Sequence, residues 1–195
     1  MDELHKLQSF DQFFGKMQIS KKQKQERIEL SEDIEDLMIV LFVLLPREEN
    51  VEELKAIFKR DLKETVSNRM PLDDELTTHL DKTIDEVIDT TIKNMDDDDY
   101  WLSEDRAKII AVNETNTSYN HYEYVLAIES GYTQKKWLTE LDDKVRPTHT
   151  EVDGETIPID DLFVVGNSFM LYPMDTTYDA EAKEIINCRC TCVYI

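Results

Sequence analysis

Residues 136–154 read KWLTELDDKVRPTHTEVDG, and they mark a change from helical patterning to strands and turns. Residues 135–139 are compatible with a β-strand, as is Val145 beyond the turn-like Leu141-Asp142-Asp143. Asp153-Gly154 is a strong turn signal because glycine readily adopts positive φ angles. The stretch therefore predicts a small, loop-rich α+β domain with short antiparallel strands.

Further strands are expected downstream of this stretch. Residues 163–165 and 169–172 are short apolar runs punctuated by prolines. Residues 185–195 are predicted to form the final strand, in which Cys188, Cys190 and Cys192 occupy alternate positions. Because alternate side chains of a strand point to one face, the three cysteines are expected to share a face.

Upstream, apolar residues recur at helical spacing in three segments, which predicts an N-terminal helical bundle. The first helix is expected to begin at Ser31, as its N-cap, and to end before Pro46. Its residues 37–45 are all apolar, so burial on most sides is expected. Residues 51–66 and 72–92 supply the other two helices. No run is long enough to span a bilayer, so no membrane association is expected.

A fourth helix is predicted from Ser103, as its N-cap, to about Ser130, with Gly131 as the residue that ends it. One side of this helix carries a row of polar residues: Arg106, Asn113, Thr117 and Asn120, with Glu114 and His121 adjacent. Two interpretations stay open. The row is either a hydrogen-bonding seam against another element or a surface that faces a ligand.

The run Asp96–Asp99 is interpreted as a solvated linker, because it lacks the spaced ligands, glycine and terminal glutamate of a calcium-binding EF-hand loop. It predicts a boundary between a helical domain, residues 1–98, and an α+β domain, residues 99–195.

Composition, the N-terminal residues and the cysteine spacing argue against three classes of protein: those that bind duplex DNA through a broad cationic face, secreted proteins, and disulfide-stabilised proteins. The 195 residues are 41% hydrophobic, enough for a core, and carry a formal net charge of -21. That charge argues against a broad cationic face for duplex DNA, whose phosphates are neutralised by Lys and Arg. An N-terminus without a charged-then-apolar layout predicts no signal peptide. Three closely spaced cysteines predict no disulfide framework, and they fit a reducing compartment.

An ordered set of residues runs through the second half of the chain: Arg106, Glu114, Asn120, Lys136, Trp137, Asp143, Arg146, His149, Asp153, Gly154, Phe163, Tyr172, Pro173, Asp175, Asn187, Cys188, Arg189 and Cys190. Between about Trp101 and Cys190 this set resembles the phage Mu protein F-like head-morphogenesis domain of tailed-phage minor head proteins. Met174 departs from the pattern, since the family often has glycine or another small or polar residue there.

The resemblance implies a structural protein, not an enzyme: a minor component of the procapsid or virion that assists head assembly. It implies a place near the portal, a role in DNA packaging or ejection, and the portal, capsid or scaffold proteins as partners. The expected location is the virion or procapsid interior, and the host cytoplasm during assembly. Some family members carry a toxin or enzyme domain after this module; the chain ends soon after Cys190, so none is expected.

A DNA contact is the least supported of the implied interactions, given the net charge of -21. Two local patches are candidates for a weak contact. One is the basic run Lys21–Arg27, and the other consists of Lys135, Lys136, Lys144 and Arg146.

His149, Cys188 and Cys190 are candidate zinc ligands, because zinc favours imidazole and thiolate groups. Cys192 or Asp153 is a candidate fourth ligand. The spacing is unfavourable: alternate positions on a strand lie ~6.5 Å apart, whereas sulfurs on one zinc ion lie ~3.8 Å apart. The alternative is that the cysteines pack as small apolar residues in the core, with His149 hydrogen-bonded nearby.

A second alternative is catalysis by a toxin-like or nuclease-type domain. His149, Arg146, Asp153 and a cysteine contain the components of a Cys–His nucleophile, but no known catalytic motif surrounds them. A third is purely structural. In it, Arg146, Asp143, Asp153 and Asp175 hold loops through charge-assisted hydrogen bonds, and Arg189 pairs with Glu114 or another acid.

Overall fold

The computed structural model describes residues 9–140 and 142–195, and the chain divides into two compact units. Within the described residues, unit 1 is 28–115, and unit 2 combines 9–27 with 116–195. The residues of helices α2 (Lys21–Leu44) and α5 (Glu104–Glu129) are divided between the two units, at positions 27/28 and 115/116. The boundary predicted at residues 98 and 99 falls inside unit 1. That residues 1–98 and 99–195 form two separately folding domains therefore stays a prediction.

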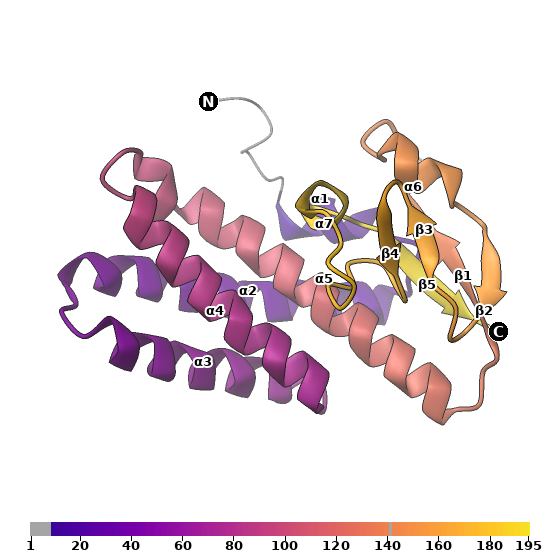
Figure 1. Cartoon of the computed structure of the whole chain (residues 1–195), viewed down its shortest axis with the longest axis horizontal. Helices are drawn as coiled ribbons and strands as arrows, with labels where there is room; N and C mark the ends of the chain where they lie inside the picture. Colours follow the sequence, from indigo (N-terminus) through magenta and orange to yellow (C-terminus); the bar gives the residue numbers. More distant parts are fainter. Residues whose placement is uncertain (1–8, 141) are drawn as a thin grey trace. The chain divides into compact units, whose positions relative to one another are not determined.

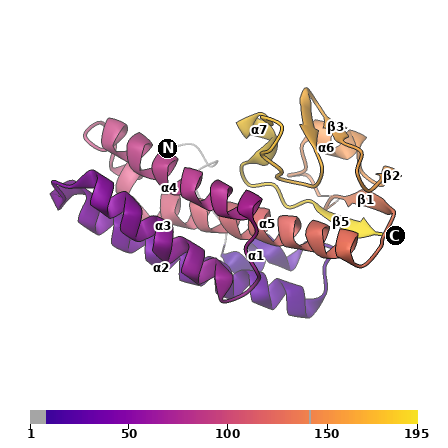
Figure 2. The same cartoon turned by 60° about the horizontal axis from the view of Figure 1, so that its bottom comes forward.

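Unit 1 is helical, as the apolar periodicity predicted. It contains α3 (Val51–Ser67), α4 (Asp74–Asn94), the adjoining parts of α2 and α5, and two 3-10 turns, η2 (Leu45–Arg47) and η3 (Asp99–Leu102). These helices lie lengthwise beside one another in both views (Figures 1 and 2). Their core combines one buried stripe from each of α2, α3 and α4: Leu30, Ile34, Met38, Leu41, Phe42, Leu54, Phe58, Leu62, Val66, Leu76, Leu80, Ile84 and Ile88.

Helix α2 differs from its prediction in two ways. It begins at Lys21, so Ser31 is not an N-cap; Ser31 lies inside the helix, buried, and its hydroxyl donates to Thr115 Oγ1 at 2.9 Å. It also has an exposed side, where Val40 and Val43 are 51% and 52% exposed. Only one stripe of the apolar run meets neighbouring helices, so uniform apolarity does not produce burial all round.

No helix in the described part of the chain combines the length and the apolarity needed to cross a membrane.

Helix α5 confirms its predicted ends. The Ser103 hydroxyl accepts a hydrogen bond from the Arg106 backbone N–H at 3.2 Å, which is the contact expected of an N-cap. Gly131 has φ of 78°, the left-handed conformation that lets glycine end a helix. The chain then turns directly into the first strand of unit 2.

Unit 2 contains a three-stranded antiparallel sheet with β1 (Gln134–Leu138) in the centre. Strands β2 (Thr156–Pro158) and β5 (Thr191–Tyr194) flank it, and β3 (Phe163–Val165) pairs with β4 (Ser168–Met170) in a separate hairpin. Short helices α1 (Phe10–Gly15), α6 (Pro147–Glu151) and α7 (Ala182–Ile185) complete the unit. The mixture of short helices and antiparallel strands confirms the predicted α+β class.

The core of unit 2 forms around Trp137 on β1, which is fully buried and stacks edge-on against Phe163. In the pairing of β1 with β5, Trp137 lies opposite Cys192. Lys135 shares the buried face of β1, as the alternation of side chains in a strand requires. A charged side chain therefore lies in the core beside the largest aromatic residue.

The predicted final strand is wrong over most of its length. Residues 182–185 form α7, and β5 covers only Thr191–Tyr194. Between them, Asn187 adopts φ of 59°, a left-handed conformation that asparagine tolerates better than most residues. Cys188 and Cys190 therefore precede the strand, and the expected strand alternation does not govern them. Val145, also predicted as strand, lies in a loop.

Candidate metal centre

His149 lies on α6, a short helix whose geometry follows from its sequence. Pro147 occupies the first helical position, where its missing N–H costs nothing and its fixed φ favours the helix. Two residues later, His149 is 1% exposed and faces the interior of unit 2. Its ring lies edge-on to Trp137, with the ring centroids 5.7 Å apart.

Cys188 and Cys190 lie on the bend between α7 and β5. Two asparagine side chains of α5 hold this bend: Asn116 Nδ2 donates to the Cys188 carbonyl at 2.8 Å, and Asn120 Nδ2 donates to the Cys190 carbonyl at 3.4 Å. The Cys190 backbone N–H also donates to Cys188 Sγ at 3.5 Å. Because both peptide groups are anchored, the two thiols have defined positions.

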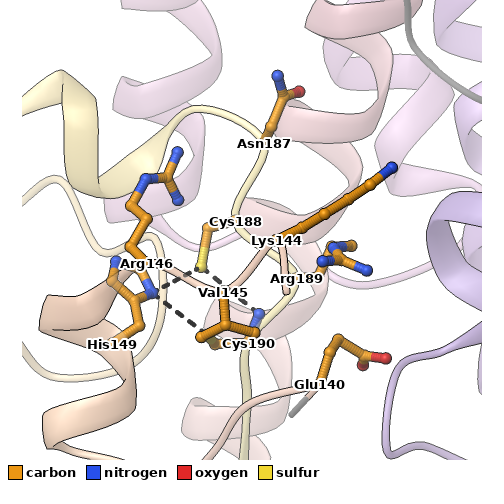
Figure 3. Close-up of a pocket in the computed structure, with 9 residues that line it drawn as sticks. All are labelled: Glu140, Lys144, Val145, Arg146, His149, Asn187, Cys188, Arg189 and Cys190. Atoms are coloured by element: carbon orange, nitrogen blue, oxygen red, sulfur yellow. Dashed lines mark hydrogen bonds between the residues drawn. The ribbon is translucent and has the colours of Figure 1, made fainter. Parts of the chain in front are cut away.

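The bend brings both sulfurs to one nitrogen of His149. Nδ1 lies 3.3 Å from Cys190 Sγ and 3.6 Å from Cys188 Sγ (Figure 3). One ligand atom from each residue lies within 4.8 Å of the others. The three predicted ligands therefore meet, and the objection based on strand spacing does not apply because these cysteines are outside β5.

The other nitrogen of His149 faces a carboxylate that the sequence did not single out. His149 Nε2 lies 3.1 Å from Glu184 Oε2, which also accepts a hydrogen bond from Thr148 Oγ1 at 2.8 Å. Glu184 is 2% exposed. No motif marked it, because a single glutamate 35 residues from its histidine carries no local signal.

The two thiols influence each other's ionisation. The hydrogen bond from Cys190, together with the facing His149 ring, holds the pKa of Cys188 well below its usual value. The same contact with Cys188, together with burial, raises the pKa of Cys190 well above its usual value. The pair therefore loses one proton readily and resists losing the second.

A small pocket adjoins the three residues. Its volume of about 20 Å³ is enough for one water molecule. Figure 3 shows the residues around it, which are Glu140, Lys144, Val145, Arg146, His149, Asn187, Cys188, Arg189 and Cys190. Two cationic side chains are tied down at its edge: Arg189 pairs with both oxygens of Asp142 at 2.7 and 2.9 Å, and Arg146 Nη2 donates to the Ile186 carbonyl.

The candidate fourth ligands do not join the group. Asp153 accepts hydrogen bonds from the N–H and hydroxyl of Thr139, at 2.7 and 2.9 Å, and so fastens the end of β1. Cys192 lies on β5, opposite Trp137. Among the residues that the structure describes, the group consists of His149, Cys188 and Cys190 alone.

The polar row on α5 makes the contacts of a hydrogen-bonding seam within each unit. In unit 2, Asn120 Nδ2 donates to the Pro173 carbonyl at 2.9 Å, and His121 Nδ1 lies 2.8 Å from the Tyr172 hydroxyl. In unit 1, Arg106 donates to Thr91 Oγ1 at 2.6 Å and to the Trp101 carbonyl at 2.8 Å.

The remaining residues of the pattern have separate positions. Asp175 is buried and accepts backbone N–H bonds from Leu171 and Thr177, both at 2.8 Å, while Asp143 is exposed. Met174 is buried with φ of 70°, a left-handed conformation that glycine adopts more readily than methionine. Lys136 is half-buried on β1, and Gly154 has φ of 78° in the turn before β2.

Arg189 pairs with an acid, as predicted, but Glu114 is not that acid. Arg189 pairs with Asp142, an acid of the same unit. Glu114 belongs to unit 1, where its carboxylate lies 2.8 Å from His79 Nε2 and accepts from Thr83 at 3.0 Å.

Both candidate DNA patches lose a member to burial. Arg27 and Lys135 are each 0% exposed, so neither side chain reaches solvent to meet a phosphate. Lys135 Nζ donates to the Ile159 carbonyl at 2.6 Å and lies 5.1 Å from the centre of the Tyr124 ring. The sequence does contain a signal for the burial of Lys135. Lys135 lies two residues before the apolar Trp137, and alternate residues of a strand share a face.

Lys135 should make stability depend on pH. Burial lowers its pKa to about 8 from a usual value of 10.5. Between these values the unfolded chain binds the proton more tightly than the folded chain does, so the contribution of Lys135 to the unfolding free energy rises with pH. Below pH 8 both forms are protonated and the contribution is constant.

We expect Lys135→Met to remove this rise. Urea unfolding of the variant and the parent at about pH 8 and about pH 10 measures the difference. Lys136→Met, at the half-buried neighbouring position, is the control and should keep the parental pH dependence. An identical response of Lys135→Met and the parent would show that Lys135 titrates normally.

Residues 76–193 match the sequence profile described as phage Mu protein F like protein. A curated relative, the NAD(+)--arginine ADP-ribosyltransferase EFV of Enterococcus faecalis, is 29% identical over 101 residues, covering 42% of this chain and 20% of that protein. The chain thus spans about a fifth of the length of this relative. No solved structure gives a significant match.

Proposed function

We propose, from the premise that this chain belongs to the phage Mu protein F-like family, that it is a minor head protein that assists phage head assembly. The family is one of head-morphogenesis proteins, which implies capsid proteins as partners. The observation that carries the proposal is the family match over residues 76–193, which runs from within α4 through α5 and the strands of unit 2 into β5. We further propose that the chain lies near the portal, inside the procapsid or virion, and takes part in DNA packaging or ejection.

The contacts of the family-pattern residues support a structural role. Asn120, Asp153 and Asp175 hold carbonyl or N–H groups of loops and strand ends, and Arg189 fastens a loop through Asp142. Such contacts rigidify a domain that has little regular secondary structure. A domain of this kind suits docking onto a larger assembly.

A role in packaging does not require a strong DNA interface. The net charge of -21 opposes one, and Arg27 and Lys135 are buried. A weak contact would use the exposed Lys21 and Lys22. Because such binding releases counterions, it would be restricted to low salt.

Sedimentation of procapsids tests the proposal. Cells that produce the phage are compared with cells whose phage carries an early stop codon in this gene. We expect the chain to sediment with procapsids at a constant ratio to the major capsid protein, and the stop codon to lower the yield of normal heads. A chain that stays in the unsedimented fraction, together with an unchanged yield of heads, would contradict the proposal.

An enzymatic role is the competing hypothesis. The curated relative is named for transfer of ADP-ribose from NAD(+) to arginine, and it matches this chain over a fifth of its own length. We propose that this chain does not share that activity. Consumption of NAD(+), or cleavage of DNA, by the purified full-length chain would favour the competing hypothesis.

A further inference from the structure

We propose that His149 Nδ1, Cys188 Sγ and Cys190 Sγ bind one zinc ion, with Glu184 orienting His149 and a water molecule in the adjoining pocket as the fourth ligand. This inference is independent of the role in head assembly. It concerns residues that belong to unit 2, so the site is complete within one compact part of the chain.

The distances between the ligand atoms match the edges of a zinc tetrahedron. With Zn–N of ~2.0 Å and Zn–S of ~2.3 Å, a tetrahedral N–S edge measures ~3.5 Å. The observed separations of Nδ1 from the two sulfurs are 3.3 and 3.6 Å. One imidazole and two thiolates also form a set of ligands that selects zinc. Calcium and magnesium prefer oxygen ligands.

The surrounding chain holds the ligands in this arrangement. The left-handed turn at Asn187 directs Cys188 and Cys190 toward His149, and Asn116 and Asn120 fix the carbonyls of the two cysteines. The backbone N–H that Cys190 donates to Cys188 Sγ would also stabilise a thiolate there. Binding would therefore require little rearrangement of the backbone.

Glu184 occupies the position of an outer partner of a metal-bound histidine. Its carboxylate faces His149 Nε2 at 3.1 Å, which leaves Nδ1 directed at the sulfurs. Such carboxylate–histidine contacts fix the tautomer and orientation of the ring at zinc sites. Gly166 supports this placement, because a side chain there would come within 3.0 Å of Glu184 Oε1.

Charge gives a further reason for a cation at this position. Cys188 and Cys190 are 2% and 3% exposed, and a buried pair of thiolates is costly without a counter-charge. A divalent ion balances the charge of the two thiolates. Three protein ligands beside a pocket that accepts one water correspond to an open zinc site, in contrast to a closed four-ligand structural site.

Metal analysis of the full-length chain, purified with zinc and without a histidine tag, tests the site. We expect about one zinc per chain, and loss of most of it in Cys188→Ser, Cys190→Ser and His149→Ala. Cys192→Ser is the matched control, because this buried cysteine lies outside the group and its loss should leave zinc content unchanged. Glu184→Gln should retain the site but weaken zinc affinity by about 10- to 100-fold.

Replacement of zinc by cobalt gives a measurement that does not depend on the folding of variants. Cobalt bound by two thiolates produces strong sulfur-to-metal absorption in the near ultraviolet, and addition of zinc should abolish it. A folded parent chain that takes up neither metal would overturn the proposal. So would a Cys188–Cys190 disulfide in that metal-free protein, or full zinc retention by the Cys188→Ser/Cys190→Ser double variant.

The test of the zinc site is separate from the test of head assembly. A metal-free parent chain that still sediments with procapsids would reject the site and leave the assembly role intact. A zinc-containing chain that is absent from procapsids would do the reverse.

Discussion

Replacement of Glu123 by alanine should destabilise unit 2 by about 3–5 kcal/mol, because it leaves the buried Arg27 guanidinium without its counter-ion. Arg27 is 0% exposed, and its Nη2 lies 3.4 Å from both carboxylate oxygens of Glu123. Burial lowers the pKa of Arg27, and the negative charge of Glu123 opposes that shift. The Tyr119 ring, with its centre 4.5 Å from the guanidinium carbon, offers only partial compensation.

Replacement of the other partner, Arg27, should lower the unfolding free energy by less. Arg27→Met keeps much of the side-chain volume and removes the charge, and Glu123 is partly exposed and can be solvated. Arg27 Nε and Nη1 have no hydrogen-bond partner among the described residues, so methionine removes two unsatisfied donors as well. The double variant Arg27→Met/Glu123→Ala should therefore be more stable than Glu123→Ala alone.

Tryptophan fluorescence can follow unit 2 separately. The chain has two tryptophans, Trp101 in unit 1 and Trp137 in unit 2, so all variants are made in a Trp101→Phe background. Urea unfolding followed by Trp137 emission then measures the unfolding free energy of the parent, the two single variants and the double variant, which together form a double-mutant cycle. Strictly additive effects, or a loss below about 0.5 kcal/mol for Glu123→Ala, would contradict the buried ion pair.

Trp137→Ala should cost a similar amount, about 3–5 kcal/mol, for a different reason. The indole is fully buried on the central strand, and its ring centroid lies 5.1 Å from that of Phe163 and 5.7 Å from that of His149. Alanine would leave a cavity lined by β1, β3 and α6. These three elements are fixed separately, so they cannot all move inward to fill it. The loss combines apolar transfer with unfilled volume.

Circular dichroism of the full chain measures this loss, while the remaining Trp101 reports on unit 1. Val193→Ala is the control, because Val193 lies on the neighbouring strand β5 but is 43% exposed. We expect it to change the unfolding free energy by less than about 0.5 kcal/mol. Equal effects of Trp137→Ala and Val193→Ala would mean that Trp137 is not the centre of the core.

Local sequence signals were sufficient where the structure depends on neighbours along the chain. Apolar periodicity predicted α3, α4 and α5, while Pro46 and Gly131 marked helix ends that the structure confirms. The same signals were insufficient for α2. Its polar first turns carry no apolar stripe, so the sequence alone suggested a start at Ser31 instead of Lys21.

The candidate site was predicted in part. The residue types His149, Cys188 and Cys190 indicated zinc ligands, because zinc favours imidazole and thiolate groups. Their convergence was not predicted. It depends on the turn at Asn187 and on two asparagines of α5, which are about 70 residues away in sequence.

Local patterns in the sequence were enough to predict the α+β class, the approximate bounds of α3, α4 and α5, the family and the chemical types of the candidate ligands. The folded chain was needed to show that Arg27 and Lys135 are buried, that Glu184 faces His149, and that Arg189 pairs with Asp142. The two sets of features differ in the sequence separation over which their causes act. Periodicity and turn residues act over a few positions, whereas burial and ion pairing depend on which distant segments the fold brings into contact.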